Sequence, residues 1–143
     1  RSSRYPALIG EDKVPALIPQ GYLHYDPYTQ RQRGDEKYLV RQRMDFLLML
    51  DHGVRIVIEV DGRHHYAHLN RSTPEKSIAD PARYAEMAAE DRRLRLKGYE
   101  VYRFGAGEFA DVEMSTWSVG PNSQRLIESF FDQLLKKHRV YSE

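Results

Sequence analysis

The sequence predicts an α/β domain in which a mixed β-sheet is flanked by helices. Two strand patterns, at 39–50 and 55–61, are separated only by a tight turn. A helix pattern at 80–97 leads directly into a strand pattern at 99–104, and an amphipathic helix pattern follows at 123–138. With a short strand expected near the N-terminus, the order strand, strand, strand, helix, strand, helix is that of an α/β sandwich.

The composition is that of one folded domain. The chain has 143 residues, of which 41% are hydrophobic and 30% charged, which argues against a disordered chain or a membrane protein. No apolar run approaches the ~20 residues that a membrane-spanning helix needs, and no signal peptide is visible. We therefore expect a cytoplasmic protein without a membrane partner. The absence of cysteine excludes disulfides, thiolate zinc sites and cysteine nucleophiles.

The charge balance neither indicates nor excludes a nucleic-acid partner. The 22 Lys and Arg residues are offset by 21 Asp and Glu residues, for a net charge of +1, and a basic face can be hidden in such a total. The first residue is Arg1 rather than Met. We therefore expect a fragment, a processed chain or the C-terminal part of a longer protein, with an attached domain or a homodimer as open alternatives.

The first 38 residues contain few regular patterns. Residues 1–20 hold three of the seven prolines and little periodicity, which indicates an extended arm. A short strand is expected at 22–25, where Asp26-Pro27 ends it, and the charged stretch 29–37 is expected to be a loop. In a single domain of residues 1–143, we expect the core at 21–105 and the C-terminal helix at 121–139.

Alternating side chains define the two faces of the central strand pair. In 39–50 one face is mostly apolar, and the other carries Arg41, Arg43, Asp45, Leu47 and Met49. In 55–61 the apolar face is formed by Ile56, Ile58 and Val60. The turn Asp51-His52-Gly53 makes the strands antiparallel neighbours. We expect their apolar faces to bury against a helix.

Start and stop signals bound the next helix and strand. Asp80 is a good N-cap for a helix whose first residue is Pro81, and Gly98 ends that helix. The strand at 99–104 follows at once. By contrast, 62–78 is polar and is expected to be irregular.

Three carboxylates are expected on one patch of the sheet. Asp45 and Glu59 lie on adjacent strands, each opposite its strand's apolar row, and Asp61 points the same way as Glu59. Such a patch needs protons or a cation to offset the repulsion, and Mg²⁺ prefers oxygen ligands while keeping several waters. This is the usual basis of metal-dependent phosphodiester hydrolysis. The alternative is that these are solvated charges on an open sheet face.

Two stretches of this region resemble the core of PD-(D/E)XK nucleases. They are residues 41–47 (RQRMDFL) and 58–65 (IEVDGRHH), and the later stretch 91–104 is similar to the very-short-patch-repair endonuclease-like branch of that superfamily. The resemblance covers about residues 40 to 105. It implies a restriction-endonuclease-like fold and a Mg²⁺- or Mn²⁺-dependent endonuclease that acts on DNA in restriction, repair or defence.

The resemblance implies a role for each matching position. Asp45 matches the metal-binding aspartate, Glu59 matches the acid of the motif, and the backbone carbonyl of Val60 adds a metal ligand in such sites. Asp61 stands where the family usually has a lysine that orients water and stabilises charge. Asp61 is therefore expected to bind metal or position water, and another residue must supply the positive or proton-handling group. We expect this group to be His65 or Arg43, with Gln42 and His64 as further candidates.

Basic and polar side chains near the site are the expected nucleic-acid contacts. They are Arg41, Gln42, Arg43, Arg63, His64 and Arg92. Arg92 has a second interpretation, as the partner of Asp91 in a buried pair, and Arg103 is open to the same two kinds of role. A zinc site at the histidines near 64–68 is not favoured, because the preceding glycine indicates a loop.

The leading hypothesis is a Mg²⁺-dependent endonuclease in which Asp45 and Glu59 hold the metal. The alternative is a catalytically inactive nucleic-acid-binding module on the same fold, and the missing lysine is its chief support. A two-carboxylate glycosidase is a third, weaker hypothesis, because it needs a sugar cleft and no metal. Cleavage that requires metal separates the first two hypotheses.

Overall fold

The structure, a computed structural model, describes residues 4–20, 44–62, 67–68, 78–116 and 118–141. These residues have a mixed α/β fold with a four-stranded sheet and three α-helices, and the predicted fold class is confirmed at this level. They belong to two compact units. The sheet unit is Pro15–Gly105, and the terminal unit is Arg1–Val14 together with Ala106–Glu143. None of the described helices is long and apolar enough to cross a bilayer.

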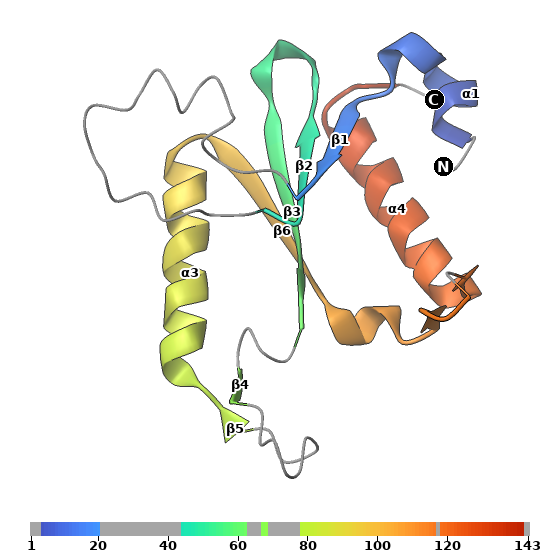
Figure 1. Cartoon of the computed structure of the whole chain (residues 1–143). Coiled ribbons are helices and arrows are strands. Elements are labelled where there is room, and N and C mark those ends of the chain that lie inside the picture. The colour runs from blue at the N-terminus through green and yellow to red at the C-terminus, as the bar shows by residue number, and fades with distance from the viewer. Residues whose placement is uncertain (1–3, 21–43, 63–66, 69–77, 117, 142–143) are drawn as a thin grey trace. The chain divides into compact units, whose positions relative to one another are not determined.

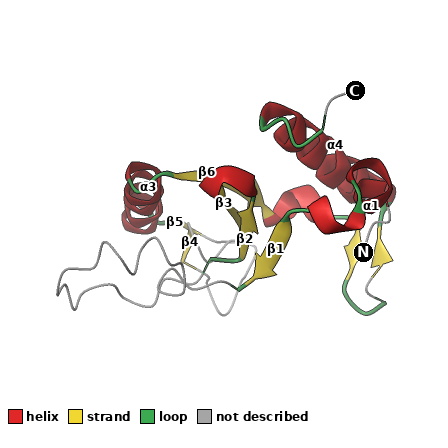
Figure 2. Cartoon of the chain, turned by 90° about the horizontal axis from the view of Figure 1, so that it is seen from above, coloured by secondary structure: helices red, strands yellow, loops and turns green. Residues whose placement is uncertain are grey.

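The sheet unit combines a hairpin with a parallel crossover (Figures 1 and 2). Its four main strands are β1 (Ala16–Pro19), β2 (Phe46–Met49), β3 (Arg55–Asp61) and β6 (Tyr99–Gly105). The strand order is β1-β2-β3-β6, in which the first two pairings are antiparallel and β3 and β6 are parallel. The helix α3 (Pro81–Leu96) makes the crossover that a parallel pair requires.

The predicted turn between β2 and β3 is confirmed. Asp51–Gly53 forms a short 3-10 turn (η3), in which His52 and Gly53 have positive φ angles of 59° and 81°. The N–H of Leu50 donates to the carbonyl of Val54 at 3.1 Å and ties the two ends of the turn together. β3 has the predicted bounds, whereas β2 begins only at Phe46. The expected strand residues 39–43 lie outside the described part of the chain.

The capping signals of α3 act as predicted. Asp80 Oδ1 accepts hydrogen bonds from the N–H groups of Ala82 at 3.0 Å and Arg83 at 3.3 Å, and Pro81 opens the helix. The helix ends at Leu96, and Gly98 takes a φ of 89°, which a side chain disfavours. Tyr99, the next residue, begins β6, so the chain returns to the sheet directly after the cap.

α3 packs on the face of the sheet that carries the acids. Leu94 of α3 shares a buried cluster with Leu47 of β2 and with Val57, which precedes Glu59 by two residues on β3. At the end of this face that contains Leu47 and Val57 the side chains are apolar, and at the other end they are acidic. α3 covers the apolar end. We expected a helix to cover the opposite face, which carries the apolar rows. α3 does not pack on that face, although the residues Ile56 and Ile58 of that face are buried.

The predicted extended arm at 1–20 was wrong. Residues Arg4–Ile9 form a helix (α1), Glu11–Lys13 a 3-10 turn (η1), and Ala16–Pro19 pairs with β2 as the end strand of the described sheet. The prolines that suggested an arm are compatible with these elements. Pro6 lies in the first turn of α1, where no intrahelical N–H bond is lost, and Pro19 closes an end strand. The strand and loop expected at 22–25 and 29–37 lie outside the described residues.

A short ladder occurs in the segment that we expected to be irregular. β4 (Ala67–His68) pairs antiparallel with β5 (Ile78–Ala79) just before α3. Two residues per strand leave almost no room for a periodic pattern, so alternation could not predict this ladder.

In the terminal unit, the last helix is held by a cap from outside its own sequence. The helix α4 (Pro121–Lys137) begins at the start of the segment expected at 121–139, two residues before the helix pattern at 123–138. Asp111 precedes it by ten residues, beside the small β7 (Val112–Glu113) and β8 (Ser118–Val119) ladder that follows the η5 turn (Ala106–Phe109). Asp111 accepts hydrogen bonds from the N–H groups of Asn122 at 2.8 Å and Ser123 at 3.1 Å, and from the Ser123 hydroxyl. These bonds hold the pKa of Asp111 below its ordinary value, led by the Ser123 hydroxyl.

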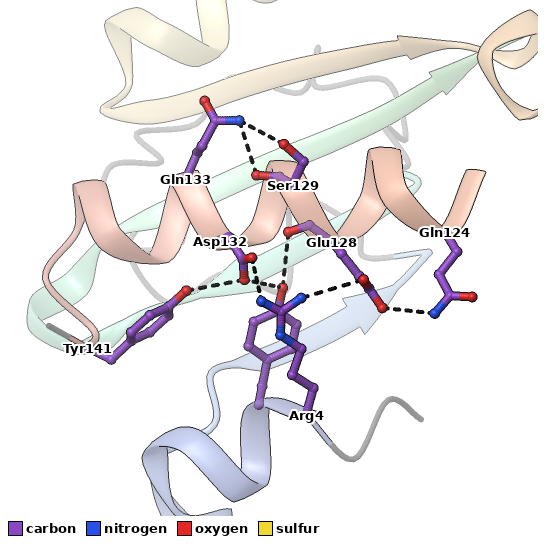
Figure 3. A network of polar contacts seen from close by, with 8 residues as sticks. Arg4, Gln124, Glu128, Ser129, Asp132, Gln133 and Tyr141 are labelled. Atoms are coloured by element: carbon purple, nitrogen blue, oxygen red, sulfur yellow. Dashed lines mark hydrogen bonds and ion pairs between the residues drawn. The ribbon is translucent and has the colours of Figure 1, made fainter. Parts of the chain in front are cut away.

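A polar network within the terminal unit joins α1 to α4 (Figure 3). Asp132 on α4 accepts hydrogen bonds from the hydroxyls of Tyr5 at 3.0 Å and Tyr141 at 3.2 Å, and Arg4 pairs with its other oxygen at 2.7 Å. Arg4 also reaches Glu128 at 3.5 Å. Burial raises the pKa of Tyr5 well above its ordinary value, and the bond to Asp132 adds to the shift. The first and last described helices are thus parts of one packed unit.

Candidate functional site

Asp45 and Glu59 meet across the β2–β3 hairpin. Phe46 pairs with Ile58 in the antiparallel register, so the next pair outward is Asp45 and Glu59, as the alternation predicts. Asp45 Oδ2 accepts a hydrogen bond from the N–H of Val60 at 2.9 Å. The carbonyl of Asp45 accepts from the N–H of Gln20 at 2.7 Å. These bonds hold Asp45 to both neighbouring strands while leaving its Oδ1 without a hydrogen bond among the described residues.

Glu59 is costly to ionise in this position. Burial raises the pKa of Glu59 from its ordinary 4.5 to about 7, and the negative charge of Asp45 adds to the shift. The positive charge of Arg103 and a hydrogen bond from the backbone of Asp45 act in the other direction, while Asp61 raises the pKa further. Near neutral pH this carboxyl therefore needs a proton or an additional cation beside it.

Asp61 faces an arginine. Its two carboxylate oxygens lie 2.8 and 3.0 Å from Nη1 of Arg103, and the side chain is only 10% exposed. Arg103 belongs to β6, where it pairs with Glu59 in the parallel register. Its Nε donates to Oδ1 of Asp91 on α3 at 2.8 Å. Two aspartates from two elements thus hold one guanidinium beside Glu59.

The arginine stays charged in this environment. Burial opposes the charge on Arg103, but the hydrogen bonds and negative charges of Asp91 and Asp61 outweigh it and raise the pKa of Arg103. Among the described residues, Nη2 of Arg103 makes no hydrogen bond, since only Nε and Nη1 reach the two aspartates. The guanidinium therefore keeps one nitrogen, with its two N–H donors, for another acceptor.

The donors fit a hard divalent cation with two protein carboxylates. Asp45 and Glu59 offer oxygen ligands, and the raised pKa of Glu59 indicates that their negative charge is incompletely balanced. Mg²⁺ commonly binds through one or two carboxylates together with waters and phosphate oxygens. The described residues contain no group of three acidic or histidine side chains arranged around one ion position. Asp61 is directed to Arg103 instead, so the pair fits the ion better than the predicted trio.

The structure brings together some of the predicted site residues. Asp45, Glu59, Val60 and Asp61 gather at one end of the β2–β3 pair. The candidates Arg41, Gln42, Arg43, Arg63, His64 and His65 lie outside the described residues. The prediction that Asp91 forms a buried pair with Arg92 was wrong, because Asp91 contacts Arg103 and, at 3.9 Å, Arg95. Arg92 is exposed on α3, where a role in nucleic-acid binding stays a prediction.

Arg103 was not predicted as a site residue, because the sequence left its two kinds of role open. Its position follows from the parallel pairing of β3 with β6, which places it opposite Glu59. The sequence placed Arg103 near the end of a strand that follows a helix, but only the β3–β6 register shows that this position lies beside the acids. Choosing between its two kinds of role required the register itself.

Comparison of the chain with protein-family models, with curated proteins and with solved structures gives no match. The function proposed below is supported by the charges, contacts and register of the residues just described.

Proposed function

We propose that this chain is a Mg²⁺- or Mn²⁺-dependent endonuclease on a restriction-endonuclease-like fold, that it acts on DNA, and that it works in the cytoplasm. The observation that carries the proposal is the Asp45–Glu59 pair, in which burial and a neighbouring acid raise the pKa of Glu59 to about 7. A carboxylate that is costly to ionise alone is stabilised by a divalent cation. The strand–turn–strand–helix–strand order around the pair supports the fold part of the proposal.

Asp45 and Glu59 would hold the cation, with the backbone carbonyl of Val60 as a further ligand. When bound, the cation supplies a polarised phosphate and a water of lowered pKa. Asp45 is positioned for this task by the Val60 N–H, which fixes one carboxylate oxygen, and no other described residue bonds the second oxygen. The proton-handling role is assigned in this proposal to His65, with Arg43 as the alternative, and Arg41, Gln42, Arg63, His64 and Arg92 as DNA contacts.

A second candidate function is DNA binding without cleavage. One observation favours it: Asp61 is engaged with Arg103, which leaves two carboxylates rather than three for an ion. Both candidates predict DNA binding, so binding alone does not separate them. Cleavage that depends on metal and on the Asp45–Glu59 pair does.

A plasmid-nicking assay with Asp45→Asn tests the proposal. Asparagine keeps an oxygen that accepts from the Val60 N–H but removes the charge that would hold the cation. We expect the wild type to nick supercoiled DNA with Mg²⁺ or Mn²⁺ and not with chelator, and Asp45→Asn to lose about 100-fold or more in rate, an amount typical of a deleted electrostatic group at a reacting centre.

Asp51→Asn is the matched control for this assay. Asp51 is an exposed aspartate in the turn that follows β2, so its loss removes one negative charge without touching the pair. We expect its nicking rate to equal that of the wild type. A wild type that binds DNA but never nicks it, under any of these metal conditions, would favour the binding module instead.

A further inference from the structure

We propose that Arg103 is the phosphate-contacting cation of this site, and that Asp61 and Asp91 are positioning residues that aim it. The inference rests on the proposed function, since it names the group that stabilises charge on a phosphate held at the Asp45–Glu59 pair. It assigns Asp61 a role other than metal ligand. Arg103 forms and breaks no covalent bond in this role; it donates hydrogen bonds to a non-bridging phosphate oxygen.

The first support is the location of Arg103. It is the direct partner of Glu59 in the β3–β6 register, and neighbouring parallel strands are ~4.8 Å apart. Side chains at paired positions stand on the same face of a sheet, and the charge of Arg103 is felt at Glu59, whose pKa it lowers. A phosphate held at the Asp45–Glu59 pair would therefore lie beside this guanidinium.

The second support is that the guanidinium is fixed before any substrate arrives. Nε and Nη1 are held by carboxylates from α3 and β3, at 2.8 Å for the shortest contact on each side. These two contacts fix the plane of the guanidinium. Among the residues that the structure describes, Nη2 is the nitrogen left for an anion. A donor that is already oriented costs little reorganisation when charge develops on a phosphate.

The charge of the cluster decides at which stage Arg103 can act. Arg103 with Asp61 and Asp91 carries one net negative charge, so this group of three would not draw DNA from a distance. Its effect is confined to contact, on a phosphate already seated at the Asp45–Glu59 pair. We therefore expect Arg103 to contribute to the chemical step and little to DNA affinity, which gives a readout that a purely structural ion pair does not share.

The test compares kcat and KM of Arg103→Gln with the wild type on a DNA oligonucleotide at saturating Mn²⁺. We expect kcat to fall about 100-fold, as for removal of one preorganised donor, with KM within about twofold of the wild type, as expected for a group that acts only in the transition state. Arg103→Lys keeps the charge but not the fork, so its kcat should fall in between.

Arg93→Gln is the matched control for loss of an ion pair. Arg93 makes a two-contact pair with Glu90 at 2.8 and 2.9 Å within the same helix, and does not contact the acids of the site. Its kcat should equal that of the wild type. A similar fall in kcat for Arg93→Gln would show that the loss of any ion pair in this region lowers the rate, and would overturn the inference. A rise in KM for Arg103→Gln that accounts for its loss of rate would also overturn it.

The remaining outcomes separate this inference from the proposed function. If Arg103→Gln cleaves at the wild-type rate while Asp45→Asn does not cleave, the inference falls and the nuclease stands. If the wild type never cleaves, both fall together. If Arg103→Gln does not fold, Arg103→Lys decides: an intermediate kcat supports the inference, and a wild-type kcat overturns it because the fork is then unnecessary.

Discussion

At the scale of single residues, the fold places the carboxyl group of Glu59 where its negative charge is poorly compensated. Burial, then Asp45, raise its pKa, and Arg103 only partly offsets them. The sequence placed Glu59 and Asp45 on one face of the sheet because strand alternation requires only local information. Alternation could not show that Asp61 would turn to Arg103, because that contact spans 42 positions of sequence and depends on the β3–β6 register.

The raised pKa of Glu59 predicts a specific dependence of stability on pH. The folded state holds the Glu59 proton up to about pH 7, and the ordinary value is 4.5. The contribution of Glu59 to the free energy of unfolding is therefore fully present below pH 4.5 and is lost as pH rises through 7. We expect the free energy of unfolding of the wild type to fall by about 1–2 kcal/mol relative to Glu59→Gln across this window, after screening at a half-buried side chain.

Urea denaturation of both proteins at several pH values measures this difference. At pH 8, Mg²⁺ should stabilise the wild type and leave Glu59→Gln unchanged, since binding to the folded state alone raises stability. Glu86→Gln, which alters an exposed glutamate of α3, is the control and should follow the wild type. A difference between wild type and Glu59→Gln that stays constant from pH 4.5 to 8 would contradict this account of the residue.

At the scale of elements, local signals predicted the hairpin and α3 well. Asp80, Pro81 and Gly98 act through contacts within a few residues of themselves, so the sequence contains the information. α1 and β1 were missed because their stability comes from partners far along the chain. β1 pairs with β2 across more than twenty intervening residues, and Tyr5 of α1 donates a hydrogen bond to Asp132. Both elements are also short and contain proline, so the local sequence did not predict them.

Gly98 gives an element-scale prediction for the α3–β6 junction. Its φ is 89°, and a Cβ added there would meet nothing within 4 Å, so a side chain would be penalised by backbone strain alone. We expect Gly98→Ala to lower the free energy of unfolding by about 1 kcal/mol. Gly107→Ala is the matched control, because a Cβ there also meets nothing and φ is not in the left-handed region. Equal effects of the two substitutions in urea denaturation would contradict the strain argument.

At the scale of the whole molecule, the two compact units do not follow one another along the sequence, because one of them combines both ends of the chain. Residues 1–14 join 106–143 in the terminal unit, while the residues of the candidate site all belong to the sheet unit. The sequence predicted one domain with its core at 21–105, whereas the sheet unit begins at Pro15 and ends at Gly105. It could not predict the grouping of the two termini, because the network at Asp132 is made by residues more than 120 positions apart.

The central claim is that the Asp45–Glu59 pair holds one divalent cation while Asp61 stays with Arg103. A crystal structure with Mn²⁺, read through its anomalous difference map, tests this claim most directly. We expect one ion within about 2–2.3 Å of carboxylate oxygens of both Asp45 and Glu59, with Nη1 of Arg103 still on Asp61. The absence of an ion at the pair, or an ion bound by Asp61 after release of Arg103, would contradict it.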